Sequence, residues 1–413
     1  MRRKRNTSNG LLGICILILL SCAMENTYCS NKQSKLYTIN FDTLKVKPTF
    51  GYSNIFDSVS IIELDNSQVM IGRIDKMDVY KDKFIVLDEN QAKGVFVFDK
   101  RGKLLRKIGS IGPGPKEYTA CTDFAIDSQS GIIYIYDWFR KIIHVYNIDT
   151  GNYLRNIKFD IDFHRIWCNN GILYAVNTSF ISQKSKGRKY ILSRLDVNSG
   201  HETQRWMDIE QYNKGWQDEL TSSSLFYHVN DGKDLFAFGF SDTIMCINNG
   251  KVIPYMAFSG DKVIKPSDIL EEERAEALNF KKRIEMRLRL GNKLGKITGV
   301  LNIFQYNNFL FFGYTTWPLF LGICNLNTNE VSTYANFKDD VLFSSSQFLH
   351  RTLPSFLVSD RGGVYYCIGT DYLLELKNHF KEGYLSNKIK NRKILEGLDE
   401  DSNPVIVYYE FKQ

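Results

Sequence analysis

The stretch FIVLDENQAKGVFVFDKRGKLLRKI, residues 84–108, returns as IYIYDWFRKIIHVYNIDTGNYLRNI at residues 133–157. The two copies are in register, because Asp88 recurs as Asp137, 49 positions later. Each copy holds three short apolar runs separated by turn residues, and a repeat of this length with several strands per unit is typical of a β-propeller blade. Neighbouring blades cover each other's faces, so the repeat predicts a closed ring of sheets.

Six apolar runs are candidates for the second strand of a blade: 84–88, 133–137, 173–177, 235–239, 310–314 and 364–368. Turn signals such as Asp-Lys-Arg-Gly at 99–102 separate the strands around them. The sequence therefore predicts an all-β, six-bladed β-propeller over residues 55–413. Strand-like stretches at 58–64 and 404–411 can close the ring by completing a blade from both chain ends, but the sequence does not say which blade.

The first 21 residues have the pattern of a secretion signal. Four basic residues at 2–5 precede an apolar run at 11–20, which is too short to cross a bilayer, where about 20 apolar residues are needed. The run ends in Leu-Leu-Ser-Cys, which looks like a bacterial lipobox and predicts cleavage and acylation at Cys22. An ordinary signal peptide that contains a cysteine is the alternative. Residues 22–54 then form a lipidated N-terminus and tether to the membrane.

The net charge of +7 comes largely from this leader. Without residues 1–21, 49 basic side chains stand against 46 acidic ones, a formal charge of +3. Nucleic-acid-binding proteins concentrate Lys and Arg on one surface, and no such concentration is apparent, so we expect no nucleic-acid partner. None of the eight cysteines forms a C-x-x-C pair, so the signatures of zinc and thioredoxin-like sites are missing.

One segment departs from the strand pattern. Residues 267–290 contain neither Pro nor Gly, with acidic residues early and basic residues late, as the helix dipole favours. Leu270, Ala277, Ile284 and Leu288 give an apolar stripe. We therefore predict a helical insertion that packs against the edge of blade 4, because amphipathic helices usually bury their stripe in their own protein. A lid or a partner-binding helix is the alternative.

The string IGSIGPGPKEY at residues 108–118 is rich in glycine but lacks the G-K-[ST] of a phosphate-binding loop. Its two prolines remove backbone donors, so we expect a rigid connection between the first two blades. Together with the strands that follow, it resembles an NHL-type repeat and, more specifically, the six-bladed β-propeller lipoproteins of Bacteroidetes. The resemblance covers residues 55–411, with Lys116 where a Gly is usual. It implies a propeller lipoprotein of the envelope, and no activity follows from it.

Catalytic signatures are missing from the chain. It has neither H-E-x-x-H nor G-x-S-x-G, and its six histidines lack metal-ligand spacing. We therefore predict no catalytic residue, no metal and no cofactor, and lean towards a protein that is not an enzyme. Propeller hydrolases hold a metal in the central channel with Asp, Asn and Glu side chains from different blades, so a channel-bound divalent cation is the alternative.

Each blade should direct one polar residue of its innermost strand into the channel. Counting back from the six apolar runs identifies Asp78, Asp123, His164 or Arg165, Ser224, Asn302 and Ser355. Our candidates for ligand binding at the channel mouth, where loops from all blades converge, are Asp78, Asp123, His164, Arg165 and Asn302. A channel that simply prefers polar linings is the alternative. Trp138 and Trp317 follow strands at the rim, where they can contact a ligand or pack between blades.

The leading hypothesis is a lipid-anchored envelope protein that binds a glycan or a peptide without chemistry. A metal-dependent propeller hydrolase or lyase acting on a glycan or lactone is the second reading. The third is an accessory subunit of an outer-membrane uptake complex, with another envelope protein as its partner. We expect the outer membrane as its location, on either the periplasmic or the outer side.

Overall fold

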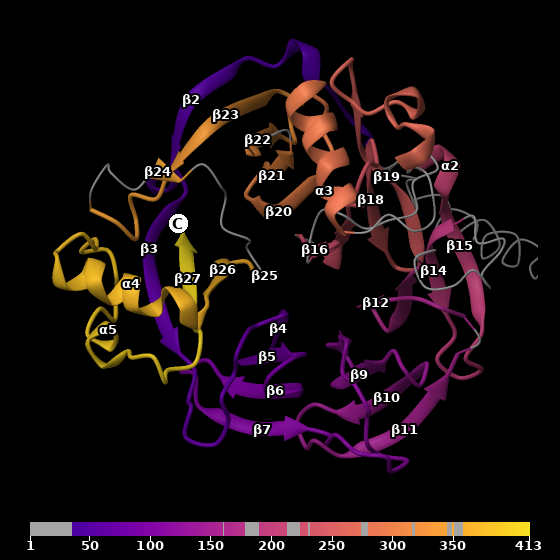
Figure 1. Ribbon diagram of the computed structural model, residues 1–413, viewed down its shortest axis with the longest axis vertical. Coiled ribbons are helices and arrows are strands. Elements are labelled where there is room, and N and C mark those ends of the chain that lie inside the picture. Colours follow the sequence, from indigo (N-terminus) through magenta and orange to yellow (C-terminus); the bar gives the residue numbers. More distant parts are fainter. Residues whose placement is uncertain are drawn as a thin grey trace, which may run out of the picture. The chain divides into compact units, whose positions relative to one another are not determined.

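The computed structural model describes residues 35–159, 161–177, 190–212, 224–229, 232–273, 280–315, 319–344, 349–350 and 358–413. Residues Tyr37–Gln413 form one compact unit. Six sheets are arranged around a common centre in this unit (Figure 1). The six-bladed β-propeller predicted from the repeat is confirmed.

Blades 1 to 3 each contain four antiparallel strands that follow one another outward from the centre (Figure 1). Blade 1 comprises β4 (Lys76–Tyr80), β5 (Lys83–Asp88), β6 (Gly94–Asp99) and β7 (Leu104–Ile108). Blade 2 comprises β8 (Asp123–Asp127), β9 (Ile132–Asp137), β10 (Ile142–Asn147) and β11 (Tyr153–Lys158). Blade 3 comprises β12 (Arg165–Asn169), β13 (Ile172–Val176), β14 (Tyr190–Leu195) and β15 (Glu202–Asp208), followed by the short helix α2 (Ile209–Tyr212).

Blades 4 and 5 each gain an outer strand from the N-terminal segment. Blade 4 comprises β16 (Phe226–His228), β17 (Asp234–Phe236), β18 (Thr243–Asn248) and β19 (Lys251–Ser259), with β1 (Tyr37–Asn40) parallel to β19. Blade 5 comprises β20 (Val300–Tyr306), β21 (Phe309–Thr315), β22 (Leu319–Asn325) and β23 (Val331–Lys338), with β2 (Val46–Gly51) parallel and β24 (Leu349–His350) antiparallel to β23. The predicted tether over 22–54 is therefore wrong from residue 37 onward, because these residues pair with the outer edges of the ring.

Blade 6 is built from both ends of the chain. It comprises β25 (Val358–Ser359), β26 (Gly363–Ile368), β27 (Val405–Phe411) and β3 (Phe56–Glu63), in that order from the centre. The C-terminal strand β27 thus pairs with β26 on one side and with the N-terminal strand β3 on the other. The predicted closure by both termini is confirmed, and the structure assigns it to blade 6.

A separate hydrophobic cluster fills the space between each pair of successive blades, including blades 6 and 1. Because side chains alternate along a strand, β5 serves two clusters at once. Ile85 and Leu87 pack towards blade 2, whereas Phe84 and Val86 pack towards blade 6. A strand buried on both faces needs apolar residues at successive positions, which explains why the apolar runs revealed the second strands.

The aspartates that mark the repeat organise the loops beside the second strands. The buried carboxylate of Asp88 accepts hydrogen bonds from the backbone N–H groups of Gly72 (2.7 Å), Gln91 (2.9 Å) and Ala92 (3.1 Å). Asp137 likewise accepts from the N–H of Thr119 at 2.6 Å. Each Asp thus joins the turn after its strand to the connection that enters the blade, which accounts for its recurrence.

The glycine-rich string between β7 and β8 is held by hydrogen bonds along its length. The Tyr118 hydroxyl donates to the Ile108 carbonyl (3.0 Å), and the Tyr146 hydroxyl donates to the Lys116 carbonyl (2.7 Å). Gly109 has φ +69°, a conformation that favours glycine. The predicted connection between the first two blades is confirmed.

The helical insertion between β19 and β20 is present, but its predicted apolar stripe is wrong. Two 3-10 turns, η5 (Pro266–Asp268) and η6 (Glu271–Glu273), precede α3 (Phe280–Leu288) and the π-helical turn η7 (Arg289–Lys293). Met286 and Leu290 are buried against Phe240 of blade 4, whereas Ile284 and Leu288 are exposed. The described segment is broken into separate turns, so one helical phase does not run through it.

A second helical segment between β26 and β27 had no counterpart in the prediction. It contains α4 (Thr370–Lys381) and α5 (Ile394–Gly397), which bury Leu373, Leu376 and Leu395 in the cluster between blades 5 and 6. Short 3-10 turns, η1 (Phe41–Thr43) and η2 (Tyr52–Asn54), follow β1 and β2. In the part of the chain that the structure describes, no helix is long and apolar enough to cross a membrane.

Candidate functional site

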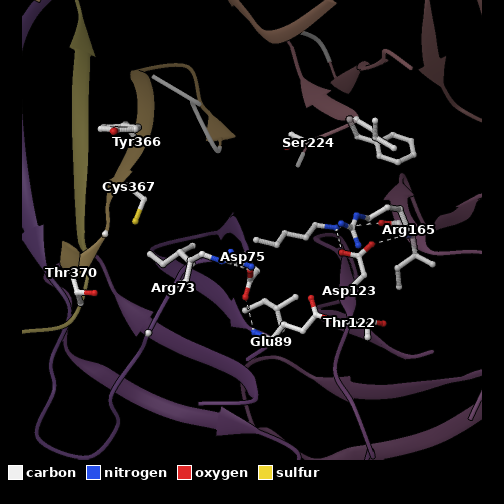
Figure 2. Close-up of a pocket in the computed structure, with 18 of the residues that line it drawn as sticks. Arg73, Asp75, Glu89, Thr122, Asp123, Arg165, Ser224, Tyr366, Cys367 and Thr370 are labelled. Atoms are coloured by element: carbon white, nitrogen blue, oxygen red, sulfur yellow. Dashed lines mark hydrogen bonds and ion pairs between the residues drawn. The ribbon is translucent and has the colours of Figure 1, made fainter. Parts of the chain in front are cut away.

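A cavity of about 570 Å³ opens on the side of the ring where the innermost strands begin, which we call the mouth face. Residues of blades 1, 2, 3, 4 and 6 line it. Figure 2 shows Arg165 on one side and Tyr366 and Thr370 on the opposite side. The lining includes charged groups of both signs together with aromatic rings: Arg73, Asp75, Lys76, Glu89, Asp123, Arg165, Trp167, Tyr366, Asp371 and Tyr372.

An ion pair between Lys76 and Asp123 joins the first three blades at this cavity. The Lys76 Nζ atom lies 2.7 Å from Asp123 Oδ1 and donates to the carbonyls of Phe124 (2.6 Å) and Ile166 (3.3 Å). The second carboxylate oxygen of Asp123 accepts from the Ile166 N–H at 2.7 Å. Both oxygens of Asp123 are therefore engaged within the protein, and its side chain is only 2% exposed. This arrangement gives Asp123 a structural role in the cavity wall.

A second group of charges lies on the blade 1 side. The Asp75 carboxylate accepts from Arg73 Nε (2.6 Å) and from the Glu89 N–H (2.8 Å), as Figure 2 shows. Burial and the neighbouring Asp75 charge raise the pKa of Glu89, while Arg165 and Arg73 act in the opposite direction. The Glu89 side chain follows the buried Asp88 directly and faces the cavity.

A second, smaller cavity of about 30 Å³ shares Lys76 with the first and is also lined by His228. The His228 ring lies between two carboxylates, with Nδ1 2.6 Å from Asp234 Oδ1 and Nε2 3.7 Å from Asp78 Oδ1. Trp167 Nε1 donates to the other Asp234 oxygen at 2.6 Å. Burial alone would lower the pKa of His228, but the charges of Asp234 and Asp78 outweigh it and hold that pKa well above its usual value.

We expect His228 to stabilise the ring in a pH-dependent manner. The folded protein holds the His228 proton more tightly than the unfolded chain, whose His pKa is about 6.5. The stabilisation is therefore complete below that pH and is lost as the pH rises through the raised folded-state pKa. The difference in thermal midpoint between the wild type and His228→Gln should be largest below about pH 6.5 and shrink as the pH rises above it. His201→Gln, at an exposed turn, is the control, and a difference that stays constant or grows with pH would contradict this account.

The structure brings only part of the predicted site together. Asp123 and Arg165 line the cavity, whereas Asp78 lies beside His228, outside the cavity lining. Burial and the adjacent Arg165 charge lower the pKa of His164 to about 3. The backbone N–H of His164 donates to the Val176 carbonyl. Neither His164 nor Asn302 lines the cavity. Asn302 lies in a bulge of β20 with φ +53°, and its backbone N–H donates to the Tyr227 hydroxyl at 3.3 Å.

The two predicted rim tryptophans have different outcomes. Trp138 packs against the cluster between blades 2 and 3 and does not line the cavity. Its ring contacts that of Phe139, with centroids 4.9 Å apart, and Phe139 is itself largely exposed. Trp317 lies outside the described residues, as do Ser355 and Cys22.

Asp78 of blade 1 and Asp123 of blade 2 do not meet, because they lie at different positions along their innermost strands. Asp78 precedes the marker Asp88 by ten positions, whereas Asp123 precedes Asp137 by fourteen. The turn between β8 and β9 is two residues longer than the turn between β4 and β5, so Asp123 lies two strand residues, about 7 Å, closer to the start of its strand than Asp78 does. The same alternation places Lys76, two positions before Asp78, on the channel side of β4 and identifies it as a site residue that the prediction missed.

Within the ranges that the structure describes, no group of three or more His, Cys, Asp and Glu side chains is arranged to hold a metal ion. The cavity offers hydrogen-bonding groups of both signs beside aromatic rings. Such a lining can bind a polar ligand through several side chains at once.

Comparisons with known proteins place the fold in a family. The chain is similar to a protein from Bacteroides fragilis that is inferred to be exported, with a TM-score of 0.70 and 16% identity over 92% of this chain and 100% of that one. A member of the DUF4221 family from Bacteroides vulgatus follows with a TM-score of 0.48 and 12% identity, over 86% and 97% of the two chains. A comparison with curated protein sequences finds no match. The profile of the domain of unknown function DUF4934 matches residues 36–410, and the chain therefore belongs to the DUF4934 family.

Proposed function

We propose that this protein is an envelope propeller that binds a polar ligand, a glycan or a peptide, in the mouth-face cavity without chemical conversion. The observation that carries the proposal is the cavity of about 570 Å³, whose lining is drawn from five blades. This volume falls within the range of small-molecule sites, about 300–1,000 Å³. A closed ring keeps such side chains in fixed positions, which lowers the entropic cost of binding.

We propose that charged and aromatic side chains of the cavity lining contact the ligand. Asp123 and Lys76 are engaged with each other in the cavity wall. Arg165 and Glu89 approach from different blades and supply a guanidinium and a carboxyl group. Tyr366 and Tyr372 add aromatic surface, which suits a sugar ring or a peptide side chain. The proposed site therefore centres on Arg165 and Glu89.

We expect Arg165→Ala and Glu89→Gln each to weaken binding about tenfold, because each removes a charged hydrogen-bonding group from the site. Calorimetry with neutral oligosaccharides and short peptides would first identify a ligand for the wild type, and the variants would then be titrated with it. Arg101→Ala is the matched control, since Arg101 is exposed in the turn between β6 and β7 on the opposite face. If a ligand binds the wild type, Arg165→Ala, Glu89→Gln and Arg101→Ala equally well, the binding site lies elsewhere.

The anchor of the proposed protein is Cys22, whose lipobox lies ahead of the ring. The likeness to an exported Bacteroides protein is consistent with an envelope location. Acyl chains on Cys22 would hold the protein at the membrane, since each buried methylene contributes about 0.8 kcal/mol. We expect Cys22→Ala to shift the protein from the membrane fraction to the soluble fraction. Unchanged acyl labelling and membrane recovery of the variant would refute the anchor, whereas Cys29→Ala should leave both unaffected.

A further inference from the structure

A further cavity, of about 470 Å³, opens on the opposite face of the ring, at the end of blade 3. It lies where the turn between β12 and β13 meets the turn between β14 and β15. Its volume falls within the range of small-molecule sites, about 300–1,000 Å³. The lining is drawn from blade 3 and includes three planar polar side chains, those of Arg194, Asn198 and Gln204. We call this cavity the blade 3 site.

Arg194 is half-buried in the blade 3 site, yet its guanidinium is not engaged by the protein. Within the residues that the structure describes, this side chain makes no hydrogen bond and no ion pair. Tyr174, its neighbour on β13, does not supply a partner, since its buried hydroxyl also lacks one there. A Cβ atom at Gly250 would lie 3.7 Å from Arg194 Nη1, so the guanidinium lies beside the turn between β18 and β19. Its N–H donors can therefore bind a carboxylate through two parallel hydrogen bonds.

The carboxylate that lines the blade 3 site is occupied in its own turn. The two oxygens of Asp196 accept hydrogen bonds, one from the Asn198 N–H at 2.9 Å and the other from Ser199 Oγ at 2.7 Å. These bonds lower the pKa of Asp196, and the Arg194 charge acts in the same direction as the smallest of the causes. Asp196 thus remains ionised without forming an ion pair with Arg194.

Two charged side chains of blade 2 lie at the edge of the blade 3 site, and both are engaged. Asp127 Oδ2 would lie 3.7 Å from a Cβ atom at Gly171, and it accepts a hydrogen bond from Ser130 Oγ at 2.5 Å. Arg155 Nη1 donates to the carbonyl of Val197, a lining residue, at 2.6 Å. Among the charged groups described at this cavity, the guanidinium of Arg194 is therefore the one whose donors the protein does not use.

Two side-chain amides lie near Arg194. Gln204 is opposite Arg194 on the neighbouring strand β15, and Asn198 lies in the turn that joins the two strands. Both side chains are exposed, and neither amide makes a hydrogen bond within the described residues. An amide both donates and accepts, which suits hydroxyl groups. The apolar part of the lining is aliphatic and small, consisting of Ile172, Leu195 and Val197.

We propose that the blade 3 site binds an acidic saccharide, in which a carboxylate lies beside hydroxyl groups. Arg194 pairs with the carboxylate, and the amides of Asn198 and Gln204 bind the hydroxyl groups next to it. The lining favours a saccharide over a peptide, because peptide side chains are usually anchored in larger apolar or aromatic pockets. This site lies on the face opposite to the mouth-face cavity, so it goes beyond the proposed function and does not depend on it.

Calorimetric titration with acidic saccharides tests the proposal. The probes are trigalacturonate, a glucuronate-containing disaccharide and N-acetylneuraminate, each compared with its methyl ester, which keeps the hydroxyl groups but removes the charge. We expect at least one acid to bind the wild type, and its ester to bind at least about tenfold more weakly. Arg194→Met should weaken binding of the acid about tenfold and leave binding of the ester nearly unchanged, whereas Arg194→Lys should retain part of the preference for the acid. Gln204→Ala should weaken binding less, about threefold, because an amide carries no charge.

Arg205→Met is the matched control for the loss of a guanidinium. Arg205 follows Gln204 on β15 but does not line the cavity, and its Nε atom donates to Glu202 Oε2 at 2.7 Å. This variant should bind the acid as the wild type does. The proposal is overturned if none of the acids binds, or if acid and ester bind equally well. It is also overturned if Arg165→Ala loses binding that Arg194→Met retains, since the acid would then occupy the mouth-face cavity.

Discussion

Deletion of residues 405–413 is expected to unfold the whole ring. The deleted strand β27 lies between β26 and β3, so its loss also detaches the N-terminal strand from blade 6. Val405, Ile406, Val407 and Tyr409 are almost completely buried and serve the clusters on both sides of the blade. Burying one such side chain contributes about 1.5–3 kcal/mol, so their combined loss rivals the 5–15 kcal/mol that separates folded from unfolded proteins.

Circular dichroism during heating would measure the effect of this deletion. The truncated protein should lack the cooperative transition of the wild type. Removal of residues 412–413 alone is the control, because these residues follow the strand and are exposed. If the larger deletion leaves a cooperative transition near the wild-type midpoint, the last strand is peripheral and the ring is closed by other contacts.

Most of the ring could be predicted from the sequence because its strands are buried on both faces. The six apolar runs all coincide with second strands, from β5 to β26, since blade-to-blade packing demands apolar residues at successive positions. The outermost strands lack this signal. β2 has four exposed residues in its six, and it therefore resembled a tether. Its place in the ring depends on hydrogen bonds to β23, which are independent of side-chain type.

The helical segments were harder to predict because their packing depends on distant blades. Residues Leu373 and Leu376 of α4 are the helix's buried contribution to a cluster formed mainly by strands of blades 5 and 6. In the 267–290 insertion the predicted stripe assumed a single unbroken helix. The described helix begins at Phe280, and its buried face is set by Phe240, which is 40 positions away in blade 4.

The candidate site could be predicted only as a location. Polar residues at the starts of innermost strands indicated the channel mouth, and Asp123 and Arg165 do line a cavity there. The partners of those residues could not be found, because ring closure sets them. His228 shows no useful sequence spacing from Asp78, yet a strand of blade 4 brings its ring within 3.7 Å of that carboxylate.

The largest effect expected from a single substitution in the site is a loss of stability in Asp123→Ala. The sequence predicted Asp123 as a ligand-binding residue, but the Asp123 carboxylate is buried and bonded through both oxygens. Its removal leaves the Lys76 ammonium without its counter-charge and the Ile166 N–H without its acceptor. Removing one partner of a buried pair typically costs 3–5 kcal/mol, and we expect about 3 kcal/mol here, because Lys76 retains its two carbonyl acceptors.

Urea unfolding of four proteins would separate this structural role from a role in binding. The wild type and Asp123→Ala are compared with Lys76→Met and with the double variant, which removes both charges. The double variant should be more stable than Asp123→Ala alone, because no ammonium is then left unpaired in the cavity wall. Asp82→Ala is the surface control; its 79% exposed carboxylate pairs with Lys83, and its loss should leave the stability close to that of the wild type. If Asp123→Ala unfolds like this control and yet loses a ligand that the wild type binds, Asp123 contacts the ligand directly and the ion pair is incidental to the fold.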